Sequence, residues 1–127
     1  MWIMNRRLLL ALLMSVACAA RADWLQVSHT ERATRYIEPS SLSIDGQFRR
    51  AWTLVDYWSR DRHVISSAKV YVELDCAQAR LRTLKEIYFA WALADGRPIG
   101  FTDGPNSWQP IKRETAEYDL YRAVCGK

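Results

Sequence analysis

The clearest pattern in this chain is an alternation of side chains along residues 63–76. The polar positions of this segment include Glu73 and Asp75. Alternation with period two is typical of a strand that buries one face. It predicts a strand that ends with Cys76 on the buried face and leaves the two carboxylates in solvent. The inward positions are small or apolar: Val64, Ser66, Ala68, Val70, Val72, Leu74 and Cys76.

Further strands are expected where β-branched and aromatic residues gather, over residues 23–29, 33–38 and 47–58, with a short turn at 39–41. Asp-Gly pairs at 45–46, 95–96 and 103–104 suit tight turns between antiparallel strands, because these residues tolerate positive φ. Residues 77–94 are ambiguous: their apolar residues follow helical spacing, but the aromatic residues near 87–91 favour strands. We expect strands there.

The C-terminal segment, residues 114–124, has helical periodicity. Ala116, Leu120, Ala123 and Val124 share one helical face, with Tyr121 and Cys125 at its edge, whereas Glu117, Asp119 and Arg122 point away. A helix lying on one face of an antiparallel sheet makes a two-layer α+β domain.

The N-terminus has the three parts of a secretory signal peptide. Arg6 and Arg7 precede an apolar run over residues 8–20, and small residues lead to a predicted cut between Ala22 and Asp23. The run has about 13 residues, fewer than the roughly 20 that a membrane-spanning helix needs. Cys18 does not follow a good lipobox, so we do not expect a lipid anchor. The predicted product is one domain, residues 23–127, in the periplasm or at the cell surface.

Removal of the leader changes the charge balance. The whole chain has 18 basic and 14 acidic residues and a net charge of +4, but three of the basic residues, Arg6, Arg7 and Arg21, belong to the leader. The remaining domain is therefore close to neutral. Its totals give no support to binding of nucleic acid.

Two cysteines, Cys76 and Cys125, remain after loss of Cys18 with the leader. An exported chain with an even number of cysteines most simply forms a disulfide. A free catalytic thiol is the alternative, but neither cysteine has a histidine beside it, and no CxxC motif is present. We expect a Cys76–Cys125 disulfide.

Catalytic motifs are scarce. The two histidines, His29 and His63, have no second ligand at metal spacing, and no nucleotide-binding or hydrolase fingerprint occurs. Glu73 and Asp75 stand two apart and could in principle pair for acid–base chemistry, although a solvated strand face explains them equally well. We expect no enzyme, no metal and no cofactor. A small hydrolase using Glu73, Asp75 and His63 is the disfavoured alternative.

Candidate binding residues are a tryptophan and four arginines. Trp58 is expected at the end of a strand, beside a polar turn that contains Arg60 and Arg62, and Trp and Arg are frequent in interface hot spots. Arg80 and Arg82 would share a strand face, with Tyr88 further along it, and could bind an acidic polymer or protein segment. The alternative is a solubilising face of mixed charge.

Five segments and one cysteine, in this order and spacing, resemble the surface-adhesin protein E family of Gram-negative bacteria. The resemblance implies an antiparallel sheet of about six strands, a C-terminal helix tied to it by a disulfide, and a possible homodimer. It also implies binding to host extracellular-matrix proteins. The matching pieces are YIEPSSL at 36–42, RAWTLVDY at 50–57, SS at 66–67, ELDC at 73–76, WQPI at 108–111 and Cys125.

These observations together predict an exported, non-enzymatic binding module, adhesin-like, that contacts a host or envelope protein. The alternative is a periplasmic structural or envelope-maintenance protein that never reaches the cell surface.

Overall fold

The structure is a computed structural model, and it describes residues 23–58 and 65–126. Outside this part of the chain lie the predicted leader, with its cut before Asp23, and three residues named above: Arg60, Arg62 and His63. No helix in the described ranges is long and apolar enough to cross a membrane. The strands are β1 (Leu25–His29), β2 (Ala33–Ile37), β3 (Ser43–Asp45), β4 (Phe48–Tyr57), β5 (Ser67–Asp75), β6 (Arg80–Phe89), β7 (Pro98–Asp103) and β8 (Gln109–Pro110).

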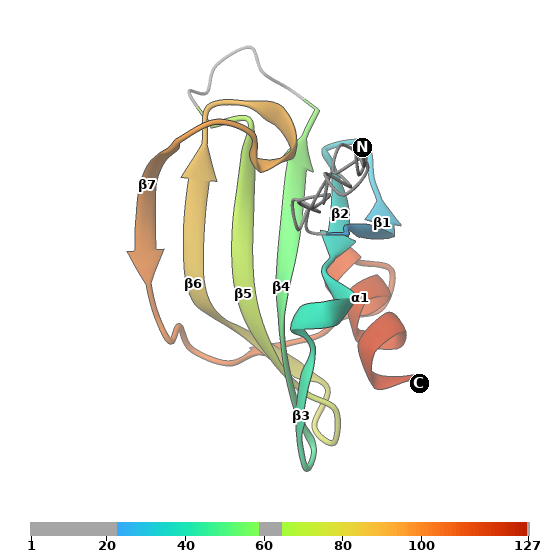
Figure 1. Ribbon diagram of the computed structural model, residues 1–127. Helices are drawn as coiled ribbons and strands as arrows, with labels where there is room; N and C mark the ends of the chain where they lie inside the picture. The colour runs from blue at the N-terminus through green and yellow to red at the C-terminus, as the bar shows by residue number, and fades with distance from the viewer. Residues whose placement is uncertain (1–22, 59–64, 127) are drawn as a thin grey trace, which may run out of the picture.

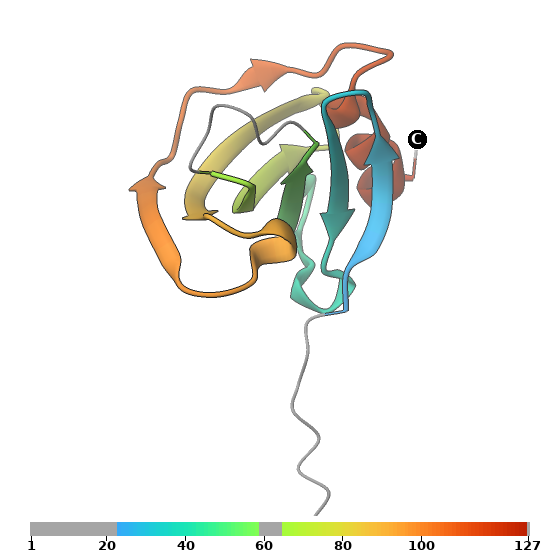
Figure 2. The same ribbon diagram turned by 90° about the horizontal axis from the view of Figure 1, so that it is seen from above.

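All strand pairs are antiparallel, and the main sheet has the order β1-β2-β4-β5-β6-β7 (Figure 1). The short strands β3 and β8 add to β4 and β6. The α-helix α1 (Ala116–Cys125) lies on the β1–β2 side of the molecule, and β7 forms the opposite edge (Figure 2). The predicted α+β class, with a C-terminal helix on an antiparallel sheet, is confirmed.

The core forms between α1 and the centre of the sheet. Leu120 and Tyr121 of the helix pack against Ile37, Ala51, Val72 and Leu74 of β2, β4 and β5. Burial of a leucine, isoleucine or valine side chain contributes roughly 1.5–3 kcal/mol. Tyr121, which we expected at the edge of the helical face, is only 8% exposed, whereas Ala123 lies in solvent.

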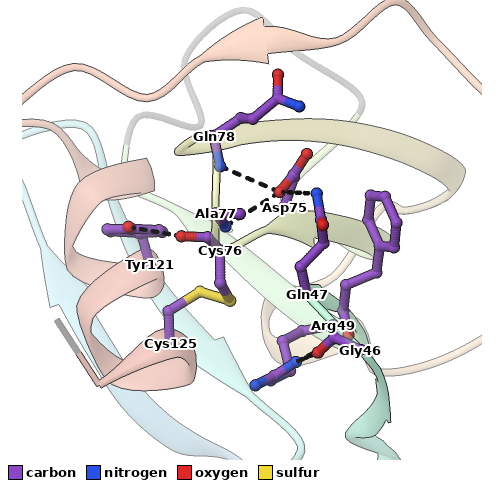
Figure 3. The surroundings of a disulfide bond; sticks show 10 residues. Gly46, Gln47, Arg49, Asp75, Cys76, Ala77, Gln78, Tyr121 and Cys125 are labelled. Carbon is purple, nitrogen blue, oxygen red and sulfur yellow. Dashed lines mark hydrogen bonds between the residues drawn. A yellow bond between two sulfur atoms is a disulfide. The ribbon is translucent and has the colours of Figure 1, made fainter.

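The predicted disulfide joins Cys76, directly after β5, to Cys125 at the end of α1, with 5.6 Å between the two Cα atoms (Figure 3). The Tyr121 hydroxyl donates to the Cys76 carbonyl oxygen at 3.2 Å in the same contact. Thr115 caps the start of the helix by accepting the Tyr118 N–H, and Gly126 ends it in the left-handed conformation. The end of the chain is thus joined both covalently and by hydrogen bonding to the turn between β5 and β6.

The structure corrects two predicted turns. Asp45-Gly46 does form a tight turn between β3 and β4. Asp95-Gly96, in contrast, belongs to a wide connection between β6 and β7 that contains the 3-10 helix η3 (Ala92–Ala94). Asp103-Gly104 ends β7 and leads to β8 rather than closing a hairpin. The predicted turn at 39–41 is a second 3-10 helix, η2 (Pro39–Ser41).

A β-bulge in β6 changes which residues share a face. Tyr71 pairs with Lys85 and Val72 pairs with Thr83, so Leu84 has no partner in this register. The extra residue reverses the alternation beyond it. Arg80 and Arg82 therefore point to the face opposite α1, whereas Tyr88 points to the face that carries α1. The expectation that Tyr88 continues the face of Arg80 and Arg82 is wrong.

The expected exposure of Glu73 and Asp75 is also wrong: they are 2% and 0% exposed. Both lie on the face opposite α1, as the alternation predicted, but this face is not open to solvent at these positions. Long side chains from the neighbouring strands cover it, as the contacts of the arginines show below.

Candidate functional site

Three large apolar side chains stand in solvent at the end of the sheet where β4 and β6 finish. Trp58 directly follows β4 and is 58% exposed. Trp91 and Leu93, in the turn around η3, are 67% and 52% exposed. We call these three residues the aromatic end. Exposed tryptophan and leucine side chains at one place on a small domain are typical of a surface that binds a partner.

The turn that carries Trp91 and Leu93 is fastened to the sheet through side-chain hydrogen bonds. The buried Ser67 hydroxyl donates to the Trp91 carbonyl oxygen at 2.5 Å and accepts the Ala94 N–H at 2.8 Å. Asp56 accepts the Leu93 N–H at 2.9 Å. Because the backbone is held from β4 and β5, less ordering of the turn is required on binding, which favours affinity.

Trp58 is held by its neighbours without being buried. Its backbone N–H donates to the Arg32 carbonyl oxygen at 3.0 Å. Its ring meets the His29 imidazole edge-on, with 5.3 Å between ring centroids, and His29 Nδ1 is 3.1 Å from the Thr34 hydroxyl. Trp58 is exposed as the sequence predicted, and His29 serves in its positioning. The role of Trp58 in binding stays a prediction.

Arg80 and Arg82 lie together on the face opposite α1, but their charges are already engaged. Both guanidinium groups stack on the Trp108 ring, at 4.5 and 4.4 Å from its centroid. Arg80 forms an ion pair with Asp75 at 3.0 Å, and Arg82 forms one with Glu73 at 2.7 Å. This arrangement is suited to holding β5, β6 and the segment around β8 together, and it leaves less charge free for a partner than we expected.

Glu73 lies between two arginines, because Arg50 of β4 contacts its other carboxylate oxygen at 2.6 Å. The hydrogen bond to Glu73 raises the pKa of Arg50. Asp75 accepts hydrogen bonds from Gln47 and from the N–H groups of Ala77 and Gln78, besides Arg80.

Burial of Asp75 raises the pKa of its carboxyl, but the backbone hydrogen bond from Gln78 and the side-chain bonds from Arg80 and Gln47 outweigh this effect and leave the pKa lowered. The Asp75 carboxylate is therefore held as an anion by fixed donors, and such a group is a poor proton carrier at neutral pH. The two oxygens of Glu73 are engaged by Arg50 and Arg82. This pair is therefore suited to structure rather than to acid–base chemistry. Within the described ranges, no group of three metal-ligating side chains comes together.

Sequence reasoning missed Trp91 and Leu93 as surface residues. Both lie in the segment that we assigned to strands, where apolar residues were expected to pack. The Asp95-Gly96 pair directly after them was a usable signal, because apolar residues that flank a turn can be left outside the core.

The fold defines a small α+β domain in which a C-terminal helix is tied to an antiparallel sheet by a disulfide. The family model described as Surface-adhesin protein E matches residues 24–126. The chain therefore belongs to the surface-adhesin protein E family, as the sequence motifs indicated. Membership in this family supports an exported, adhesin-like protein.

Solved structures agree on the fold. The chain resembles crystal form II of Haemophilus influenzae protein E with a TM-score of 0.61 and 16% identity, over 84% of this chain and 90% of that one. The protein E structure from non-typeable Haemophilus influenzae gives 0.57 and 15%, over 86% and 79%. A comparison with curated proteins found no match.

Proposed function

We propose that this protein is an exported, non-enzymatic binding module that contacts a host extracellular-matrix protein through its aromatic end. The observation that carries the proposal is the exposure of Trp58, Trp91 and Leu93 at one end of the sheet. Membership in a family of surface adhesins supports export and partner binding. The predicted cleavage between Ala22 and Asp23 supports export as well.

The aromatic end suits a protein partner for a physical reason. Tryptophan rings bury a large area with little loss of side-chain freedom, and they contribute strongly when a partner covers them. Trp91 and Leu93 are carried by a turn that three hydrogen bonds fasten to β4 and β5. A preformed apolar surface of this kind binds without the cost of first ordering a loop.

The test is binding of the purified, disulfide-bonded protein to immobilised extracellular-matrix proteins, measured by surface plasmon resonance. We expect the double variant Trp58→Ala/Trp91→Ala to bind at least about tenfold more weakly than wild type. The matched control is Ile44→Ala, because Ile44 is 66% exposed in β3, near the opposite end of β4. Equal binding by wild type and the double variant, or equal weakening by the control, would contradict the proposal.

The alternative function is a periplasmic structural or envelope-maintenance protein, and localisation distinguishes the two. Protease added to intact cells should digest the protein if it is displayed on the surface. Complete protection in intact cells, with digestion after the outer membrane is permeabilised, would favour the periplasmic alternative.

The predicted homodimer has one structural feature in its favour. β7 is an edge strand that pairs only with β6 among the described strands, and it carries Phe101 at 65% exposure. An edge strand with exposed apolar side chains can pair with a second chain. We propose this edge as the dimer contact.

A further inference from the structure

A cavity of about 200 Å³ opens on the face of the sheet that carries α1, beside the helix. Four apolar side chains form part of its lining, and we call them the floor: Val55 of β4, Val70 and Val72 of β5, and Leu120 of α1. Thr53 and Thr83 add hydroxyl groups, and the Thr53 hydroxyl is already committed to the Val70 carbonyl oxygen at 2.9 Å. The floor therefore suits the aliphatic part of a ligand.

The rim of the cavity holds one base and two acids. Arg35 of β2 is 3.2 Å from the Glu117 carboxylate of α1, and this pair neutralises itself. The second acid, Glu86 of β6, has no cationic partner in the part of the chain that the structure describes. Its carboxylate accepts a hydrogen bond from the Tyr88 hydroxyl at 2.6 Å. The cavity thus carries one uncompensated negative charge, at Glu86.

Glu86 affects the pKa values of two neighbouring tyrosines. The hydrogen bond to Glu86 raises the pKa of Tyr88, with Thr102 opposing the shift. Burial, followed by the charge of Glu86, raises the pKa of Tyr57, which lines the cavity. Tyr57 also offers an aromatic ring within the same cavity, and aromatic rings attract cations over their faces.

From these features we propose that the cavity is a binding site for an organic cation on an aliphatic stem, with the ammonium or guanidinium group at Glu86 and the stem on the valine floor. The cavity is smaller than the roughly 300–1,000 Å³ typical of sites for drug-sized ligands. Its volume suits a single long side chain. The two sources of this chemistry are a free alkyl diamine and a lysine or arginine side chain of a protein.

This site lies on residues other than those of the aromatic end, so it does not depend on the function proposed above. The experiment uses the protein expressed with its leader and purified in its disulfide-bonded form. The probes are 1,5-diaminopentane, a Gly-Lys-Gly peptide with blocked ends, and the same peptide with norleucine in place of lysine. Norleucine keeps the aliphatic stem but lacks the charge. Binding is followed by ¹H–¹⁵N NMR shifts of the backbone around residues 55, 70 and 86.

We expect saturable shifts with the lysine peptide or the diamine, and at least about tenfold weaker binding of the norleucine peptide. Glu86→Gln should weaken cation binding to a similar extent, because it removes the charge but keeps an oxygen that accepts from Tyr88. The control is Glu31→Gln, which removes an exposed acid outside the cavity and should leave binding unchanged.

The sources are distinguished by which probe binds: shifts with the diamine indicate a free amine, whereas shifts with the lysine peptide alone indicate a protein side chain. If Glu86→Gln unfolds at the same midpoint temperature as wild type, a general loss of folding is excluded as the cause of weaker binding. The proposal is overturned if neither cation shifts these resonances at millimolar concentration, if norleucine binds as well as lysine, or if Glu86→Gln binds like wild type.

Discussion

The disulfide between Cys76 and Cys125 offers the sharpest test of how this domain is held together. The two cysteines are 49 residues apart in the sequence. In the chain-entropy treatment, closing a loop of this length restricts the unfolded chain by about 4 kcal/mol. Domains of this size have total stabilities of roughly 5–15 kcal/mol. Loss of the cross-link should therefore remove a large share of the stability of this protein.

The perturbation is the double variant Cys76→Ser/Cys125→Ser, compared with wild type in urea unfolding followed by far-UV circular dichroism. We expect the free energy of unfolding to fall by about 3–4 kcal/mol. The helix should remain folded in the absence of urea, because Leu120 and Tyr121 still pack in the core. A matched control is Tyr121→Phe, which deletes only the hydrogen bond to the Cys76 carbonyl oxygen and should cost about 1 kcal/mol.

A fall of less than about 1 kcal/mol in the double variant would refute this reasoning. It would mean that the unfolded chain is already compact enough for the cross-link to restrict it little. Equal falls in the double variant and in Tyr121→Phe would mean that the local contact, rather than the closed loop, supplies the stabilisation.

Two further predictions concern the face opposite α1. Arg82→Met should lower the free energy of unfolding by about 2 kcal/mol, because it deletes an ion pair to a buried carboxylate and a stack on an indole ring. The control Arg97→Met, at an exposed position, should change the free energy of unfolding little. Equal effects of the two variants in urea unfolding would contradict this prediction. The folded protein lowers the pKa of Asp75 below its usual 3.8, so the stability it contributes is present above about pH 4 and is lost as the pH falls through the lowered pKa. The stability difference between wild type and Asp75→Asn should accordingly shrink below pH 4 in urea unfolding at a series of pH values, and a difference that stays constant down to pH 2 would show that ionisation of Asp75 is unimportant.

Local patterns predicted the elements that depend on local chemistry. The alternation around Val72 and Leu74 located β5, and helical spacing around Leu120 located α1. Cys76 was placed at the end of the buried strand face, and the even number of cysteines in the expected mature chain predicted its link to Cys125. These inferences succeeded because period, turn residues and cysteine number are properties of short segments or of totals.

The binding surfaces were harder to predict from the sequence. Trp58 was predicted to be exposed, since it follows a long strand and precedes a polar turn. Trp91 was assigned to a strand, because aromatic residues favour strands, and its position in the exposed turn around η3 was missed. Glu86 gave no signal of its own, since the valines that make the floor of its cavity come from other strands.

The amino-acid sequence alone determined the class of the domain, the order of its main elements, its disulfide and its family. Only the tertiary structure decided that Glu73 and Asp75 are buried, because the arginines that pair with them come from two other strands, β4 and β6. Only the tertiary structure showed the bulge at Leu84, which turns Tyr88 to the other face. Alternation along one strand predicts which side chains share a face. The neighbouring strands and the register between them decide whether that face is open to solvent.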